Sequence, residues 1–292
     1  MCSSDLVAIL FVQWIRFELS FENSNPNADR IYQVQESIKR TEGDFKQIHI
    51  RPPVHKELKE RYPNIEEIVL LSRGNATDLE TEIPVRCDIM YATTNFLKVF
   101  PMDCVEGTTA SLETKEAVFF ISEKAALKIY GSTKNAIGKN YNFFDKFYPI
   151  EGVLRIPDNT MIQFDVILLW ENAIMNYDGG MHYMLLEENT TLTPEFEESI
   201  ANYLNQRYET ENSLVLQPLK NIHLRTDDKT WKDELEDKIY YGNIKEIQIF
   251  IAIILLLILL SVINYTNTST ARAFNRLREV GMRKVMGSTR EQ

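Results

Sequence analysis

The longest uninterrupted apolar run of the chain covers residues 247–263, near the C-terminal end. Gln248 and Ser261 are its only polar residues, and it has no glycine, proline or charge. As a helix the run is about 25 Å long, and tyrosines at positions 240, 241 and 265 extend it past the roughly 30 Å of a bilayer's hydrocarbon. A buried core helix is the alternative, but such helices are usually shorter or carry a polar face. The pattern therefore predicts a transmembrane helix over residues 244–264.

A second apolar run, LVAILFVQWI at residues 6–15, lies at the start of the chain and has about half the length of a membrane span. It has neither the basic region nor the small-residue cleavage site of a signal peptide. We interpret residues 6–17 as the remnant of a first transmembrane helix and expect the sequence to be a piece of a longer protein.

The pattern between the two apolar runs is that of an α+β domain over residues 18–243. Alternating positions predict a strand at 32–38, and a short helix follows Pro52-Pro53 up to Arg61 before a second strand at 65–71. A second unit of this kind has a strand at 183–187, a helix with Thr193 as N-cap and Pro194 at its first position, and a strand at 214–216. We predict two β-α-β units that share one sheet.

Residues 76–177 lie between these units and read as an inserted, mostly β segment. A strand is expected at 117–121, a short helix between the N-cap Ser122 and the terminating Gly131, and a further strand at 148–154. Gly179-Gly180 marks the return to the second unit. The expected fold class is therefore an α+β extracytoplasmic domain flanked by transmembrane α-helices.

Charge is distributed unevenly about the predicted span. After residue 264 the chain has six of its 32 Lys and Arg residues but only two of its 42 Asp and Glu residues. Because basic residues beside a span stay on the cytoplasmic side, the tail at 265–292 is predicted inside and the acidic body outside. The net charge of −10 argues against a nucleic-acid partner.

The basic tail shows a helical pattern with a break. Glu279 stands three residues after Arg276 and four before Arg283, which favours ion pairs on a helix surface. Apolar residues at 274, 277, 280 and 282 suggest that this helix lies at the membrane face. Gly287 is expected to end it, and Ser288 to start another. An ordinary basic flank of the span would explain the charge but not these breaks.

Residue patterns for catalysis or metal binding were not found. The four histidines lack an HExxH motif or a close His/Cys pair, and GSTKNAIGK at 131–139 has the wrong glycine spacing for a phosphate loop. The Glu-rich stretch at 187–198 is interpreted as a solvated helix face. Cys87 and Cys104 could form a disulfide or stay as free thiols, and the sequence leaves both open. We predict no catalytic, cofactor-binding or metal-binding residue.

Three stretches of the chain resemble the FtsX/MacB-type family of ABC transporter permeases in its Bacteroidota form. They are FELSFENSNPNADRIYQV near the start, the middle stretch from TTNFLKVF through EKAALKIYGSTKNAIGKNYNFF to YPIEGVLRIPDNTMIQFDVIL, and NYTNTSTARAFNRLREVGMRKVMGSTREQ at the end. The last is the most specific, because R-E-V-G-x-R-K-x-x-G directly follows a predicted span.

The resemblance implies a multi-pass protein of the inner membrane, with four transmembrane helices and a large periplasmic domain between the first two. That domain would consist of a porter-like subdomain at 18–75 and 178–225 and an inserted sabre-like subdomain at 76–177. The family forms homodimers or paralogous dimers on a separate cytoplasmic ATPase, with membrane lipid around them and a periplasmic adaptor or cargo as further partners. The chain itself would not be an enzyme and would hold no cofactor.

The resemblance also implies a mechanism, in which ATP hydrolysis drives shape changes of the periplasmic domain for export, efflux or mechanotransmission. By matching position, Glu279, Gly281, Arg283, Lys284 and Gly287 would contact the ATPase. No residue selects a cargo. The alternative function is a membrane signalling receptor with an extracytoplasmic sensor domain, although a receptor's long heptad helix would conflict with the break at Gly287-Ser288.

Overall fold

The computed structural model describes residues 3–38, 45–50, 54–76, 79–81, 85–143, 146–171, 180–226, 230–231 and 241–286. The chain divides into two units, one made of residues 1–19 and 243–292 and the other of residues 20–242. We call the first the helical unit and the second the body. Of the sequence-based predictions, those at Pro52-Pro53, Gly179, Tyr240 and Gly287-Ser288 lie outside the described residues.

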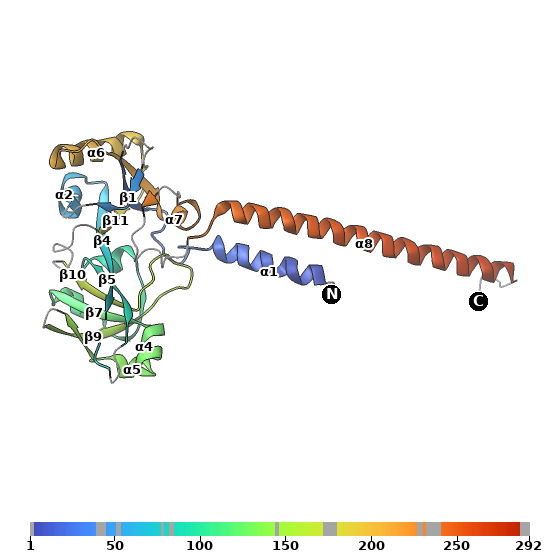
Figure 1. Cartoon of the computed structure of the whole chain (residues 1–292), viewed down its shortest axis with the longest axis horizontal. Coiled ribbons are helices and arrows are strands. Elements are labelled where there is room, and N and C mark those ends of the chain that lie inside the picture. The colour runs from blue at the N-terminus through green and yellow to red at the C-terminus, as the bar shows by residue number, and fades with distance from the viewer. Residues whose placement is uncertain are drawn as a thin grey trace. The chain divides into compact units, whose positions relative to one another are not determined.

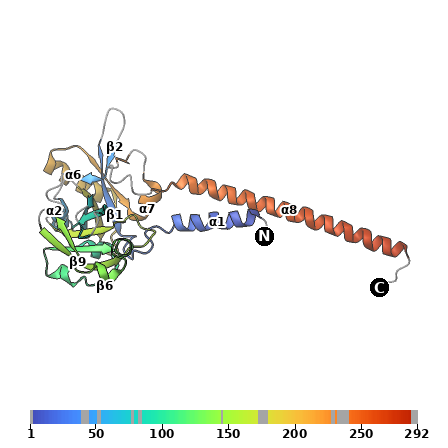
Figure 2. The ribbon, with the colours of Figure 1, turned by 60° about the horizontal axis from the view of Figure 1, so that its bottom comes forward.

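The helical unit consists of α1 (Ser3–Glu18) and α8 (Ile244–Val285), which run side by side in both views (Figures 1 and 2). The ring of Phe250 on α8 lies 4.9 Å from that of Phe11 and 4.8 Å from that of Trp14, both on α1. Asn243 caps α8 by accepting a hydrogen bond from the backbone N–H of Lys245 at 2.9 Å. The two helices therefore meet through aromatic side chains at their apolar faces.

α8 is the one helix among the described residues that is long and apolar enough to cross a membrane. Its 42 residues form a single helix about 63 Å long. The helix continues without a break across residues 264 and 265, where the predicted span ends and the predicted cytoplasmic segment begins. The physical reason is that no glycine or proline stands between Ile244 and Gly281 to interrupt the backbone hydrogen bonds.

The body is organised around four strands in the order β12 (Ser213–Pro218), β1 (Ile31–Ile38), β11 (Gly180–Leu186) and β4 (Ile65–Ala76). Neighbouring strands in this set are all antiparallel. The helix α2 (Val54–Arg61) joins β1 to β4, and α6 (Pro194–Tyr208) joins β11 to β12. The shared sheet is confirmed, and the two β-α-β units interleave in the manner of a ferredoxin-like split βαβ fold.

The inserted segment continues the same sheet beyond β4 (Figure 1). Its strands follow in the order β5 (Cys87–Ala92), β10 (Val166–Trp170), β7 (Ala117–Ser122), β9 (Lys146–Arg155) and β6 (Asp103–Gly107). The remaining elements are β2 (Phe45–Gln47), β3 (His49–Ile50), β8 (Asn140–Phe143), β13 (Thr230–Trp231), α3 (Phe96–Val99), the 3-10 helix η1 (Ala110–Glu113), α4 (Glu123–Tyr130), α5 (Thr133–Ala136) and α7 (Leu219–Arg225). The mixed α/β fold class is confirmed, while the division into porter-like and sabre-like subdomains stays a prediction.

The predicted helix boundaries follow from local chemistry. The side chain of Ser122 accepts the backbone N–H of Ala125 at the start of α4, and Gly131 ends that helix with a φ of 75°. Thr193 caps α6 in the same way, with Pro194 at the first helical position. These cap predictions are confirmed.

Three groups of buried apolar side chains hold the body together. One lies between the four-stranded set and the helices α2 and α6, and a second lies inside the inserted segment under α4 and α5. The third spans both, from Phe21 and Ile31 near the start of the body to Phe96, Phe120 and Leu169. β11 is buried along its whole length, which is why its sequence lacks alternation. The inserted segment therefore shares its core with the rest of the body.

Candidate functional site

The residues that the resemblance places against an ATPase lie in the last two turns of α8, except Gly287, which is outside the described residues. Arg283 donates a hydrogen bond to Glu279 at 2.6 Å, so the predicted i,i+4 ion pair is confirmed. Both side chains are more than half exposed. Lys284 lies in the last turn, where its charge favours the carboxyl-terminal end of the helix dipole. The structure does not test contact with an ATPase.

The apolar side chains of this segment are exposed as well. Phe274 and Leu277 are 67% and 68% exposed, and Val285 is 90% exposed. Nothing in the described part of the chain covers them. The segment is therefore a basic helix whose apolar side chains are left exposed by the described residues.

A buried carboxylate fastens the beginning of the body to a distant loop. Glu22, which has a φ of 62°, accepts the backbone N–H of Met161 at 2.6 Å and the hydroxyl of Thr160 at 3.0 and 2.9 Å. The backbone N–H of Glu22 donates to the carbonyl of Asn159 at 2.8 Å, and the side-chain amide of Asn159 donates to the carbonyl of Ser20 at 2.8 Å. We call these contacts the Glu22 clamp. Burial raises the pKa of Glu22, and this effect outweighs the hydrogen bonds from Met161 and Thr160, which lower it.

A second carboxylate joins α2 to the end of β10. One oxygen of Glu171 lies 3.3 Å from the ring nitrogen Nε2 of His55 and accepts from the ammonium of Lys56 at 3.0 Å. The hydrogen bond with His55, together with the charge of Lys56 and in spite of partial burial, lowers the pKa of Glu171 to about 2. Glu171 is therefore ionised at neutral pH and ties the four-stranded set to the inserted segment.

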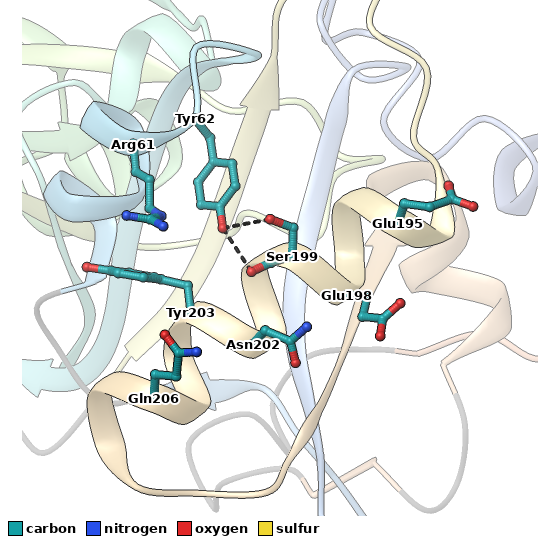
Figure 3. A pocket seen from close by; sticks show the side chains of 8 residues that line it. All are labelled: Arg61, Tyr62, Glu195, Glu198, Ser199, Asn202, Tyr203 and Gln206. Atoms are coloured by element: carbon teal, nitrogen blue, oxygen red, sulfur yellow. Dashed lines mark hydrogen bonds between the residues drawn. The ribbon is translucent and has the colours of Figure 1, made fainter.

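A polar hollow of about 370 Å³ lies between the end of α2 and the outer face of α6 (Figure 3). The hydroxyl of Tyr62 donates to the carbonyl of Ser199 at 2.9 Å, and the guanidinium of Arg61 lies 4.8 Å from the ring centroid of Tyr203. Glu195, Glu198, Asn202 and Gln206 complete its lining. The polar side chains of this hollow can form hydrogen bonds with a polar surface placed against it.

Sequence reasoning missed both the hollow and the Glu22 clamp. The Glu-rich stretch at 187–198 was interpreted as a solvated face. The two tyrosines that shape the hollow stand 141 positions apart, Tyr62 directly after α2 and Tyr203 on α6. No sequence pattern indicates this hollow, because it forms only where α2 packs on α6. The stretches SFENSNP at 20–26 and PDNTMI at 157–162 contain the clamp residues, but only the fold brings them together.

The cysteines that the structure describes, Cys87 and Cys104, are free. Burial, with a smaller contribution from the nearby carboxylate of Asp165, raises the pKa of Cys87 to about 11, so its thiol stays protonated at neutral pH. The thiol of Cys104 donates to the carbonyl of Glu106 at 3.1 Å. The disulfide that the sequence left open is therefore absent between them. Within the described ranges, no three His, Cys, Asp or Glu side chains are grouped to hold a metal ion.

Comparison with known proteins places the fold in a family. Residues 6–239 match the family model of the MacB-like periplasmic core domain. A solved domain assigned to a permease protein of Porphyromonas gingivalis is 22% identical, with a TM-score of 0.55, over 66% of this chain and 91% of that one. The periplasmic region of MacB from Actinobacillus actinomycetemcomitans is 12% identical, with a TM-score of 0.50, over 69% of this chain and 94% of that one. Curated protein sequences gave no match.

The structural likenesses establish the fold, and the family match covers well over half of the chain, from α1 to the end of the body. With α8 as a candidate span, the body is the periplasmic domain of a membrane-anchored protein. The chain belongs to the MacB/FtsX-like ABC transporter permeases, through their MacB-like periplasmic core domain.

Proposed function

We propose that the chain is a permease subunit that transmits ATP-driven motion from a separate cytoplasmic ATPase to its periplasmic body. The protein would be a multi-pass protein of the inner membrane and would act as a homodimer or with a paralogous permease. The residues proposed to receive the motion lie in the segment after residue 264, which contains Glu279, Gly281, Arg283 and Lys284 and continues to Gly287.

The observation that carries this proposal is the continuity of α8. One helix runs from Ile244 through the apolar stretch and on to Val285 without a break. A displacement at its basic end would therefore pass along a rigid rod, because axial hydrogen bonds oppose bending at every residue. The contacts of Phe250 with Phe11 and Trp14 support transmission from α8 to α1 as well.

Within the body, the Glu22 clamp supports a route by which motion reaches the inserted segment. Glu22 follows α1 by four residues and is bonded to Thr160 and Met161, 138 and 139 positions later. A pull on the chain after α1 would move the loop that precedes β10. The family match disfavours the receptor alternative, since it assigns the extracytoplasmic domain to transporters.

Purification of the full-length protein from native membranes, followed by hydrogen exchange with and without an ATP–vanadate trap, tests the proposal. We expect an ABC ATPase to co-purify and protection in the body, at residues 20–242, to change on trapping. The matched control is the same complex with the ATPase's phosphate-loop lysine replaced. If the ATPase binds but protection in the body is unchanged, motion transmission is rejected. If no ATPase co-purifies, the permease role itself fails.

A further inference from the structure

The carboxylate of the Glu22 clamp is buried against neutral donors. Glu22 is 1% exposed, and its hydrogen bonds come from the N–H of Met161 and the hydroxyl of Thr160, both in residues 157–164, which we call the clamp loop. Because removal from water disfavours a charge, burial raises the pKa of Glu22 above its ordinary value of 4.5. The clamp is therefore most stable below pH 4.5 and weakens as the pH rises through the pKa of the clamped carboxyl.

The geometry of the clamp accommodates both protonation states. The hydroxyl of Thr160 lies 3.0 and 2.9 Å from the two carboxyl oxygens of Glu22, and it also accepts the N–H of Ile162 at 3.2 Å. This hydroxyl donates to an ionised Glu22, whereas it can accept the proton of a protonated one. The N–H of Met161 donates to the carboxyl group in either state. Protonation therefore changes the strength of the clamp and keeps its partners.

The turn that carries Glu22 is strained, and the residue before it is packed. Glu22 has a φ of 62°, in the left-handed region that L residues adopt at an energetic cost. The ring of Phe21 is buried and stacks on that of His223 on α7, with the centroids 3.5 Å apart. Opening of the clamp would relieve the strain while Phe21 stays packed, so we expect a local opening of the body and not its unfolding.

The clamp loop is held on its other side by a charge that does not titrate. The guanidinium of Arg73 on β4 donates to the carbonyl of Gln163 at 2.9 Å and to that of Met161 at 3.2 Å, and it stays ionised at any physiological pH. β4 pairs with β11 over residues 65–71 and with β5 over residues 71–76. Arg73 thus lies where the sheet passes from the four-stranded set to the inserted segment. A loop released from the clamp stays attached to this part of the sheet.

We propose that the Glu22 clamp is a proton-dependent latch. A protonated Glu22 fixes the start of the body to the clamp loop, and an ionised Glu22 lets this contact open while Arg73 keeps the loop on the sheet. Because the body is a periplasmic domain, acid outside the cytoplasm would tighten the link between the start of the body and the sheet. This inference goes beyond the proposed function, and the latch needs no ATPase, so failure of either proposal leaves the other standing.

Other titratable groups near the clamp can be separated from Glu22. Those next to the clamp residues, along the chain or by ring contact, are Glu18, Asp158, Asp165 and His223. The two aspartates have partners of their own, since Asp158 pairs with Lys124 and Asp165 accepts the N–H of Asp88 at 3.0 Å. Substitution of Glu22 leaves all these side chains in place, so a pH effect that they cause would persist in the variant.

Hydrogen exchange at single amides of the full-length protein in detergent, without an ATPase, tests the latch. The N–H of Met161 reports on the clamp, and the N–H of Gly138, which donates to the carbonyl of Ile150 at 2.9 Å, is the reference. After correction for intrinsic exchange, protection of Met161 should fall at least about threefold from pH 4 to 8, because ionisation weakens the clamp. Protection of Gly138 should stay constant. A constant value at Met161 overturns the latch.

Glu22→Gln supplies a latch that cannot lose a proton. Its amide offers an acceptor to Met161 and a donor to Thr160, as the protonated carboxyl group does. We expect its protection at Met161 to be independent of pH and to match, within about twofold, that of the unsubstituted protein at pH 4. If protection in Glu22→Gln still falls with rising pH, another group titrates and the proposal is wrong.

Thr160 offers a matched pair of variants. Thr160→Val removes a donor that favours the ionised form, so protection of Met161 should fall at least about twofold further than in the unsubstituted protein over the same pH range. Thr160→Ser retains the hydroxyl and should follow the unsubstituted protein. Each variant is compared with its own value at pH 4, which separates a general loss of stability from the latch. Identical pH profiles of the two variants overturn the proposal.

Discussion

The body buries its large apolar side chains, whereas the helical unit leaves most of its own exposed. In the body, Phe119 and Phe120 are fully buried, whereas Leu256 and Leu259 on α8 are 60% and 55% exposed. Both regions are rich in apolar residues, so composition does not separate them. The difference is that the body buries its apolar surface within the chain, while the described residues leave the apolar side chains of α8 exposed. Along residues 247–263, the candidate span, hydrocarbon would cover them.

Among substitutions that compare the two regions, the largest loss of stability is expected when a buried side chain of the body is shortened. Phe120→Ala should lower the free energy of unfolding of the body by about 3–5 kcal/mol, because a buried ring leaves a cavity. Leu256→Ala on α8 should change it by less than about 0.5 kcal/mol in detergent. Chemical denaturation of the full chain, followed by tryptophan fluorescence, measures both. Equal losses from the two variants would contradict the comparison.

The next effect concerns the Glu22 clamp. Glu22→Ala should cost about 1–3 kcal/mol, since the N–H of Met161 and the hydroxyl of Thr160 lose their acceptor. Glu22→Gln keeps an acceptor and is the matched control.

The pH dependence of Glu22 has a definite sign. Burial raises its folded-state pKa above the ordinary value of 4.5, so its contribution is most favourable below pH 4.5 and is lost as the pH rises through the folded-state pKa. Glu22→Gln should flatten that loss. A denaturation series from pH 4 to 8 in which the two proteins stay parallel would show that Glu22 does not titrate in this way.

A smaller effect of opposite sign is expected at Glu171. Hydrogen bonding to His55 and Lys56 lowers its pKa from 4.5 to about 2, so its contribution is present above pH 4.5 and is lost as the pH falls towards 2. Glu171→Gln should cost about 1–2 kcal/mol at neutral pH and remove this acid dependence. The exposed Glu188→Gln is the control, and a Glu171→Gln protein with unchanged acid stability would rule out the assignment.

The smallest effect belongs to the exposed pair on α8. Glu279→Gln should change stability by about 0.3–0.5 kcal/mol, far less than Glu171→Gln, because both partners of the pair are solvated. Chemical denaturation of the full chain measures this change. A loss of stability as large as that of Glu171→Gln would contradict this prediction.

Local elements were predictable to different degrees. The caps at Ser122 and Thr193 and the end at Gly131 were found because a cap is decided by the residues beside it. The boundary at residue 264, between the predicted span and the cytoplasmic segment, stays a prediction, and a single helix continues across it. Among the proposed contact residues, the Glu279–Arg283 pairing was predictable because both lie on one helix.

By itself, the sequence determined the span, the asymmetry of charge around it, most strands and the residues of the helix ends. All of these depend on side chains within a few positions of one another. Only the tertiary structure decided that the two β-α-β units interleave, that the hollow forms between α2 and α6, and that Glu22 meets a loop 138 positions away. The physical reason is that burial and strand pairing depend on segments that are distant in the sequence. The hydrophobic effect requires an apolar face to be covered, but it does not select the segment that covers it.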